Sequence, residues 1–185
     1  MGKSVVYWIY FKRYACRTEP PGKAKWRNQK MEQKTGLVLE GGGMRGIYTA
    51  GVLDVFLDEG LTFDGVIGVS AGAVHGCSFL SGQKGRSIRY YKKYCADKRF
   101  MSTENLIRTG NFVDTDFCYH ELPEILDVYD YDTFNKNKEH TDFYVVCSDV
   151  EKGKPVYAKL HDMKRDIGYI QASASLPICV KVCGA

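Results

Sequence analysis

Ser70 is the residue with the clearest chemical potential in this sequence, because it is the centre of a G-x-S-x-G pentapeptide. An apolar stretch of strand character precedes the pentapeptide at residues 64–67, and small and apolar residues at helical spacing follow at 71–80. A serine between a strand and a helix predicts a nucleophile elbow, whose hydroxyl projects where free N–H groups favour negative charge. The simpler alternative is a glycine-rich turn that contains a serine by chance. The elbow would comprise Gly68, Val69, Ser70, Ala71 and Gly72.

A glycine-rich loop upstream supplies a partner for this serine. The apolar run at residues 37–39 ends in three glycines, and a helical pattern follows from Ile47 to Glu59. Such a loop points several backbone N–H groups at one spot, which suits an anion. Arg45 adds a positive charge that supports the loop, or that pairs with Asp54 or Glu59. The expected oxyanion-hole segment is Gly41, Gly42, Gly43, Met44, Arg45 and Gly46.

The spacing of the two motifs predicts that they meet. Gly43 precedes Ser70 by 27 residues, which is the length of one strand–helix–strand unit. Both turns then lie at the same edge of a parallel sheet. An oxyanion hole beside a serine nucleophile is the expected product of that geometry.

The two motifs at this spacing resemble the patatin-like phospholipase family, in which a G-G-G-x-[KR]-G loop on the first strand precedes G-x-S-x-G on the next. Residues 145–157 look like the family's later strand, tight turn and strand. The segment QASASLP at 171–177 looks like its A-S-x-S-x-P segment, and the middle at 109–134 resembles bacterial-type members. The resemblance covers residues 34–177.

The resemblance implies a serine lipid acyl hydrolase of the phospholipase or carboxylesterase type, acting in lipid metabolism or degradation. Ser70 would attack the acyl carbonyl and form an acyl-enzyme, while backbone N–H groups of Gly42, Gly43 and Met44 hold the oxyanion. The expected partner is a lipid or fatty-acyl ester, with no metal, organic cofactor or nucleic acid. A cytoplasmic protein with peripheral membrane contact is expected.

One part of the family's machinery has no match. The family uses a Ser–Asp dyad whose Asp lies in an Asp-Gly motif soon after the segment matched by Ser173–Pro177. The sequence has no Asp after Asp166, and its single Asp-Gly pair, Asp64-Gly65, precedes the nucleophile. A serine hydroxyl without a base is a weak nucleophile. We therefore expect a C-terminally incomplete domain with little Ser70-dependent esterase activity.

Composition agrees with one partial domain. The 185 residues are one domain's worth, and a hydrophobic content of 44% is enough for a core. Seven cysteines without a C-x-x-C pair indicate reduced thiols, and the four histidines lack metal-ligand spacing. Residues 1–30 hold eight Lys or Arg against one acidic residue. We expect them to be a basic, disordered extension, with Met31 an alternative start and residues 31–185 forming the partial patatin-like domain.

The elements that must position the motifs alternate along the chain. Strands are expected at 36–40, 65–69, 143–147 and 155–160, and helices at 46–59, 71–80, 85–96, 121–128 and 163–174. The pattern predicts the α/β class, as a patatin-like three-layer α/β/α arrangement with a mainly parallel central sheet, incomplete at its C-terminus.

Three other interpretations stay open. Gly41-x-Gly43-x-x-Gly46 also fits the dinucleotide fingerprint, with Asp64 as the acidic residue of a Rossmann-type binder. Ser70, Asp149 and His161 occur in the order of an α/β-hydrolase triad. In the third, the domain is a non-catalytic fragment or a lipid- or protein-binding module. The aromatic residues of the middle segment either line an acyl-chain groove or belong to the core.

Overall fold

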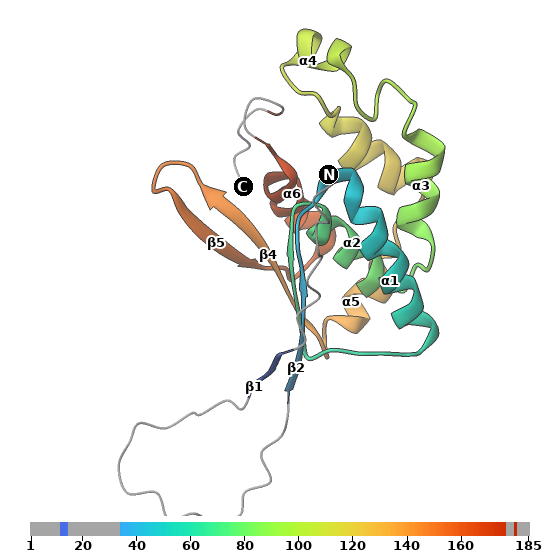
Figure 1. Cartoon of the computed structure of the whole chain (residues 1–185), viewed down its shortest axis with the longest axis vertical. Coiled ribbons are helices and arrows are strands. Elements are labelled where there is room, and N and C mark those ends of the chain that lie inside the picture. The colour runs from blue at the N-terminus through green and yellow to red at the C-terminus, as the bar shows by residue number, and fades with distance from the viewer. Residues whose placement is uncertain (1–11, 15–33, 177–179, 181–185) are drawn as a thin grey trace, which may run out of the picture.

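The protein is described here through a computed structural model, which covers residues 12–14, 34–176 and 180, with 12–14 given by their backbone alone. Its strands form one sheet with the order β1-β2-β3-β4-β5 (Figure 1). The central pairs β2–β3 and β3–β4 are parallel, and the outer pairs β1–β2 and β4–β5 are antiparallel. The strands are β1 (Lys12–Tyr14), β2 (Lys34–Leu39), β3 (Gly65–Val69), β4 (Asp142–Asp149) and β5 (Lys154–Lys159).

The helices fall between the strands. The segment η1 (Gly43–Gly46) is a 3₁₀ turn that leads into α1, and η2 (Phe117–Leu126) has π-helical geometry and contains Pro123. All five helices expected from the sequence are present, although the expected helix at 121–128 starts four residues earlier. The α-helices are α1 (Ile47–Asp58), α2 (Ala71–Leu80), α3 (Arg86–Tyr94), α4 (Thr103–Thr109), α5 (Tyr131–Asn137) and α6 (Met163–Ala174).

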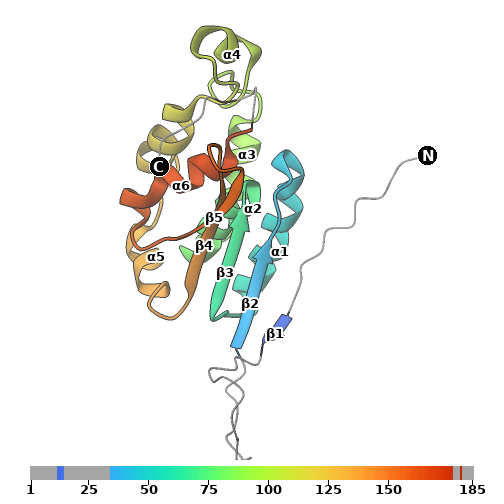
Figure 2. The ribbon, with the colours of Figure 1, turned by 90° about the vertical axis from the view of Figure 1, so that its left-hand side faces the viewer.

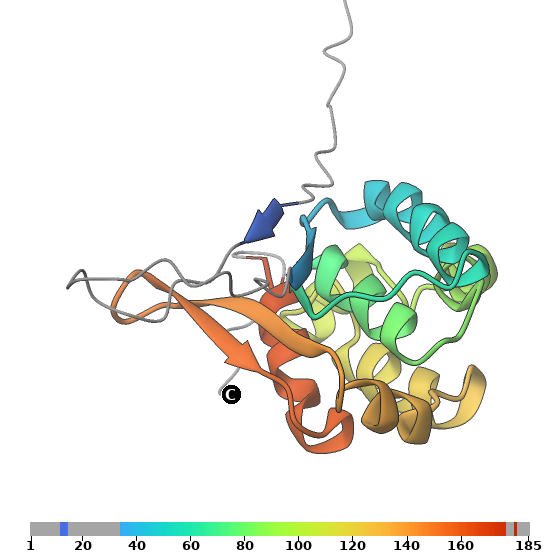
Figure 3. The ribbon, with the colours of Figure 1, turned by 90° about the horizontal axis from the view of Figure 1, so that it is seen from below.

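One face of the sheet carries the main core. Alternate side chains of β2, β3 and β4 on this face are at most 1% exposed, as expected where helices cover a sheet. They pack with buried residues of α1, α2, α5 and α6 in one cluster. Figure 3, seen from below, shows α1, α2 and α5 gathered on that side. The strand members of the cluster are Leu37, Leu39, Val66, Phe143 and Val145.

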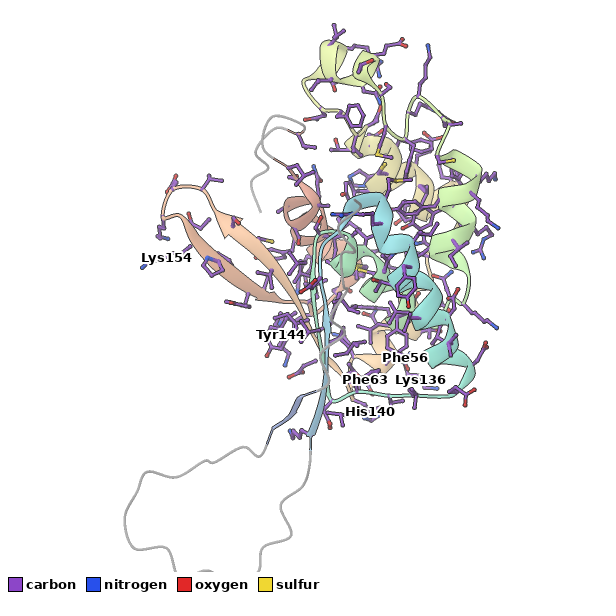
Figure 4. The ribbon with its side chains drawn as sticks, viewed as in Figure 1. Phe56, Phe63, Lys136, His140, Tyr144 and Lys154 are labelled. Atoms are coloured by element: carbon purple, nitrogen blue, oxygen red, sulfur yellow. The ribbon has the colours of Figure 1, made fainter. Side chains whose placement is uncertain are left out.

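The opposite face of the sheet is more open. Val38 and Val69 are 41% and 37% exposed, and Tyr144 is half-buried on the same face. Figure 4 shows Tyr144 on the side of the sheet away from Phe56 and Phe63, which pack together on the helical side. The structure therefore confirms the expected α/β class with parallel central strand pairs. A helical layer over the second face stays a prediction, because the helices that contact the sheet in the described residues lie on the first.

A second, smaller cluster stands beyond α2. Buried aromatic and aliphatic residues of α3, η2 and the segment before α4 pack together here. Tyr94 meets Phe117 edge to face with ring centroids 5.5 Å apart, and Tyr91 meets Phe100 at 5.5 Å. This aromatic group faces α2 from the side opposite to the sheet. Its fully buried members are Tyr90, Tyr94, Phe100, Phe117 and Leu122.

A short strand of the N-terminal extension borders the sheet. Residues 12–14 form β1, which pairs with β2 through Lys12↔Gly36, Arg13↔Thr35 and Tyr14↔Lys34 (Figure 2). The edge of β2 offers backbone hydrogen bonds to a neighbouring segment, which these three residues take up. The rest of 1–30 and the alternative start at Met31 lie outside the described residues, and the division at residue 30 stays a prediction.

Candidate active site

Ser70 occupies a strained turn between β3 and α2. Its backbone angles are φ 53° and ψ −124°, and it is the one non-glycine residue with positive φ in the described part of the chain. A side chain in that region costs on the order of 1–3 kcal/mol, which a fold tolerates where neighbouring structure imposes it. The hydrogen bonds from Ala73 N and Val74 N to Ser70 O, at 2.9 and 3.2 Å, fasten the turn to the first turn of α2. The serine therefore sits in elbow geometry.

The glycine-rich loop lies directly beside this serine. A Cβ added to Gly41 would be 3.1 Å from Ser70 Cβ and 3.8 Å from Ser70 Oγ. Gly43 has φ +54°, which favours glycine, and starts the η1 turn. The two motifs thus meet at one edge of the sheet, as their spacing predicts.

The loop offers backbone donors at this edge. Arg45 N donates to Gly42 O at 3.2 Å, whereas the N–H groups of Gly43 and Met44 have no hydrogen-bond partner among the described residues. The Arg45 side chain is exposed and forms no ion pair within the described part. Its pairing with Asp54, an alternative from the sequence, is not seen, since Asp54 Oδ1 accepts from Gly85 N at 2.8 Å. Free N–H groups beside a serine are an arrangement that suits an anion.

Close backbone packing holds α2 in place behind the serine. A Cβ on Gly72 would lie 2.3 Å from Leu39 O and 2.6 Å from Glu40 O, and a Cβ on Gly68 would lie 2.6 Å from Ala73 Cα. Only glycine permits these approaches. The two glycines of the pentapeptide therefore seat the first turn of α2 against the end of β2, next to the glycine-rich loop.

Ser173 is a site residue whose contacts the sequence did not predict. Its Oγ accepts from Ser70 N at 2.8 Å and donates to Val146 O at 2.6 Å, so one hydroxyl ties α6 to the elbow and to β4. These partners are 103 and 27 residues away in the sequence. The A-S-x-S-x-P resemblance marked this segment, but no local pattern indicates which atoms it reaches.

An apolar cavity of about 370 Å³ opens at the elbow. Ser70, Ala71, Val74 and Cys77 line it from one face of α2, and Gly43 and Met44 line it from the loop. The aromatic middle segment, for which the sequence left a groove role and a core role open, contributes to this wall. The opposite walls come from the second cluster and from α6, and include Tyr90, Tyr91, Phe100, Phe112, Tyr119, Leu122, Met163, Ile167 and Ile170.

No carboxylate or imidazole lines the cavity in the described part of the chain. Asp149 is occupied at the β4–β5 turn, where Oδ1 accepts from Glu151 N and Lys152 N at 3.0 Å each. The backbone N–H of Lys152, and to a lesser extent its side chain, donate to Asp149 and hold the pKa of this carboxyl below its ordinary value. Asp149 is therefore engaged as a turn residue and is not among the residues that line the cavity with Ser70.

The α/β-hydrolase triad is excluded by strand register. Leu160 N donates to Phe143 O, so His161 follows the end of β5 that lies beside the start of β4. Ser70 follows Val69, which pairs with Val146, three residues further along β4. Three residues of strand span about 10 Å. His161 and Ser70 consequently lie toward opposite ends of the strands.

The dinucleotide interpretation fails on a similar ground. Asp64 Oδ2 accepts from Thr35 N at 2.6 Å and from Thr35 Oγ1 at 3.2 Å, at the start of β2 and β3. The glycine-rich loop follows the other end of β2. An acidic residue that binds a ribose must stand at the same edge as the glycine-rich turn. Asp64 is on the wrong edge.

His75 is buried beside the site without touching the cavity. It is 1% exposed, neither ring nitrogen has a partner among the described residues, and a Cβ on Gly46 would be 2.9 Å from Nε2. Burial lowers the pKa of His75 to about 4, so the imidazole is neutral at ordinary pH. It packs against the end of the glycine-rich turn and against Tyr91.

Other features of the described residues bear on the site's chemistry. They contain no group of three or more His, Cys, Asp or Glu side chains placed to hold a metal ion. No helix among them has the length and apolar character needed to cross a bilayer. The thiol of Cys77 is buried in the cavity wall, whereas that of Cys95 is exposed.

Comparison with known proteins agrees with this geometry. The sequence model of the patatin-like phospholipase family matches residues 37–181. An uncharacterized protein of Escherichia coli K12, YjjU, is 40% identical over 82 residues. That match covers 44% of this chain and 23% of the relative, so the chain spans about a quarter of the curated relative's length.

The family match contains every residue of the elbow and of the glycine-rich loop, together with Ser173. The structure brings these residues to one edge of an α/β sheet, beside an apolar cavity. The chain belongs to the patatin-like phospholipase family.

Proposed function

We propose that the protein is a serine acyl hydrolase acting on lipid or fatty-acyl esters, with Ser70 as nucleophile. The observation that carries the proposal is the strained φ of Ser70 at the mouth of an apolar cavity, beside the unpaired N–H groups of Gly43 and Met44. The acyl chain occupies the cavity, and the ester carbonyl oxygen lies against the N–H groups. Ser70 Oγ adds to the carbonyl carbon, the alcohol leaves, and water releases the acid.

Proton transfer is the weak step of this mechanism in the described structure. The Ser70 hydroxyl has no hydrogen-bond partner among the described residues, and the described cavity wall offers no base. A positioned general base contributes about 10²–10⁴-fold to such reactions. Acylation of Ser70 in the 185-residue polypeptide is therefore slow and accelerates as hydroxide becomes available. This observation also favours a second role, in which the cavity binds acyl lipids without turnover.

Exposed apolar side chains support contact with a lipid surface. Met44, Ile47 and Tyr48 follow the glycine-rich loop and are 44%, 37% and 64% exposed. Apolar and aromatic residues around a cavity mouth suit a peripheral interaction with aggregated substrate. We propose a cytoplasmic location, in peripheral contact with a membrane.

A covalent-labelling experiment separates catalysis from simple binding. The 185-residue chain is incubated with p-nitrophenyl octanoate or an alkyl fluorophosphonate, and the modified peptide is located by mass spectrometry. We expect slow modification of Ser70 that speeds up at alkaline pH and disappears in Ser70→Ala. Ser175→Ala is the matched control, because Ser175 also lines the cavity and its loss leaves Ser70 labelling intact. Ser70→Ala labelling equal to that of the unchanged chain would refute the nucleophile assignment.

A further inference from the structure

The inner end of the cavity differs in chemistry from its mouth. Arg86 and Tyr90, in the first two turns of α3, line the cavity although they are only 5% and 4% exposed. Arg86 Nη1 lies 3.5 Å from Ser78 Oγ, which places the guanidinium eight residues along α2 from Ser70. Eight helical residues span about 12 Å. A charged, donor-rich group thus stands at the far end of a cavity whose remaining wall is mostly apolar.

Donors at this end lack acceptors. Arg86 Nε and the hydroxyls of Tyr90 and Ser87 are buried and have no hydrogen-bond partner among the described residues. The Ser87 hydroxyl neighbours that of Tyr90, and a bond between them would leave one hydroxyl proton and the Arg86 Nε–H unused. Burial raises the pKa of Tyr90, so its hydroxyl keeps its proton. Buried donors almost always find acceptors, and this group points to one that a ligand brings.

Charge at the inner end is also unbalanced. Arg89 Nε and Nη2 donate to the two oxygens of Asp127 at 2.7 and 2.8 Å. Arg86 Nε forms only a long ion pair with Asp127 Oδ1, at 3.5 Å and without a hydrogen bond, and Arg86 Nη2 donates to the Asp127 backbone carbonyl at 2.8 Å. Two guanidinium groups therefore share one carboxylate, which leaves a net positive charge.

The surroundings of Arg86 stabilise this cation only partly. Its guanidinium carbon lies 5.4 and 5.3 Å from the ring centroids of Tyr90 and Tyr129. Such cation–π contacts offset part of the cost of burying a charge. Glu124, which accepts from Tyr131 OH at the cavity wall, is exposed and pairs with Lys164. A carboxylate delivered through the cavity would satisfy both the unpaired donors and the charge.

We propose that the inner end of the cavity, formed by Arg86 and Tyr90, binds a carboxylate at the far end of the acyl group. The preferred substrates would then be monoesters of medium-chain dicarboxylic acids, with the ester at Ser70 and the free carboxylate at Arg86. The inference rests on the proposed function only in placing the ester at Ser70. A neutral alkyl chain of the same length would leave the donors unpaired.

Binding is measured in a Ser70→Ala background, so that turnover plays no part. Monomethyl octanedioate and methyl octanoate are titrated into the protein by calorimetry. They have the same chain length and ester, and differ in the terminal carboxylate. Hydrogen bonds to a charged group predict at least about tenfold tighter binding of the dicarboxylate monoester. Equal affinity, tighter binding of methyl octanoate, or no binding of either ligand would overturn the proposal.

Two further variants identify the residues responsible. Arg86→Gln should abolish the preference, and Tyr90→Phe, which removes a single hydroxyl and keeps the ring, should reduce it several-fold. Tyr94→Phe is the matched control, since Tyr94 is a buried tyrosine of the same helix outside the cavity wall, and it should keep the preference. A preference that survives both Arg86→Gln and Tyr90→Phe would contradict the assignment. If Ser70 is not labelled but the protein still prefers the dicarboxylate monoester, the hydrolase mechanism is rejected and the carboxylate site is retained.

Discussion

The two sides of α2 are built on different principles. Toward the sheet, Gly72 and Gly76 bring the helix backbone against Leu39 and the ring of Phe143, with no room for another atom. Toward α3, Ala71, Val74 and Cys77 border a cavity whose far end holds unpaired polar atoms. The tight side fixes the position of Ser70, and the open side leaves an apolar cavity in front of it, where the proposed function places the acyl group. Close packing therefore lies behind the serine, and the free space lies in front of it.

Gly72→Ala is expected to have the largest effect on stability, because it adds an atom on the closely packed side of α2. The added Cβ would lie 2.3 Å from Leu39 O and 2.6 Å from Glu40 O, both backbone atoms that cannot move alone. We expect a loss of about 3 kcal/mol in the free energy of unfolding, the upper end of the usual cost of overpacking. Urea denaturation measures it.

Gly51→Ala is the matched control for that substitution. Gly51 lies within α1, and a Cβ there meets nothing within 4 Å. Alanine should therefore stabilise the protein by about 0.5–1 kcal/mol through its higher helix propensity. Similar destabilisation by both substitutions would show that the tight packing of α2 is not what Gly72 provides.

A third prediction concerns His75, which is buried on α2 between its tight side and its open side. Its pKa is about 4 in the folded protein against 6.5 in the reference state, because burial disfavours the charged imidazolium. The unfolded chain therefore binds more protons between these values, and stability falls as the pH drops through this window. Between about pH 7 and about pH 5 this residue alone should cost about 2 kcal/mol.

The comparison is made by urea unfolding at both pH values. His75→Leu, which removes both unpaired nitrogens, should lose correspondingly less stability on acidification. His140→Gln, at an exposed histidine far from the site in Figure 4, should behave like the unchanged chain. An acid response that His75→Leu leaves unaltered would contradict a buried neutral imidazole.

Ser173→Ala should have a moderate effect on stability and a selective effect on chemistry. The substitution removes the acceptor of Ser70 N and the donor to Val146 O, at a cost of about 1–3 kcal/mol. Because the elbow loses its anchor to α6, Ser70 labelling should slow by more than stability alone explains. Thermal unfolding and labelling rates are measured together. Ser175→Ala, whose hydroxyl bonds to Gln171 O on its own helix, should leave the labelling rate unchanged.

The sequence predicted the framework of the site accurately. β3 and α2 begin and end at the expected residues, because apolar alternation, the two glycines and a run of small residues are all local signals. The meeting of the glycine-rich loop with Ser70 followed from one crossover connection of 27 residues. Local pattern and simple topology were sufficient for these features.

Other parts needed tertiary contacts that no local pattern contains. α4 and α5 have seven residues each, too few for a periodicity, although Ser102 and Asp130 cap them in the way such residues often do. β1 is three residues of a charged segment, and only the edge of β2 makes it a strand. Ser173 and Arg86 act on partners brought near by the fold, so their residue types alone revealed no role.

The positive φ of Ser70 means that folding and chemistry favour different residues at one position. Glycine would relieve the backbone strain, by on the order of 1 kcal/mol or more, and would be the preferred residue if stability alone were selected. Serine at this position lowers the small free energy of unfolding of the protein, and in return its Oγ projects from the turn. Variants chosen only for thermostability will therefore tend to lose that atom first.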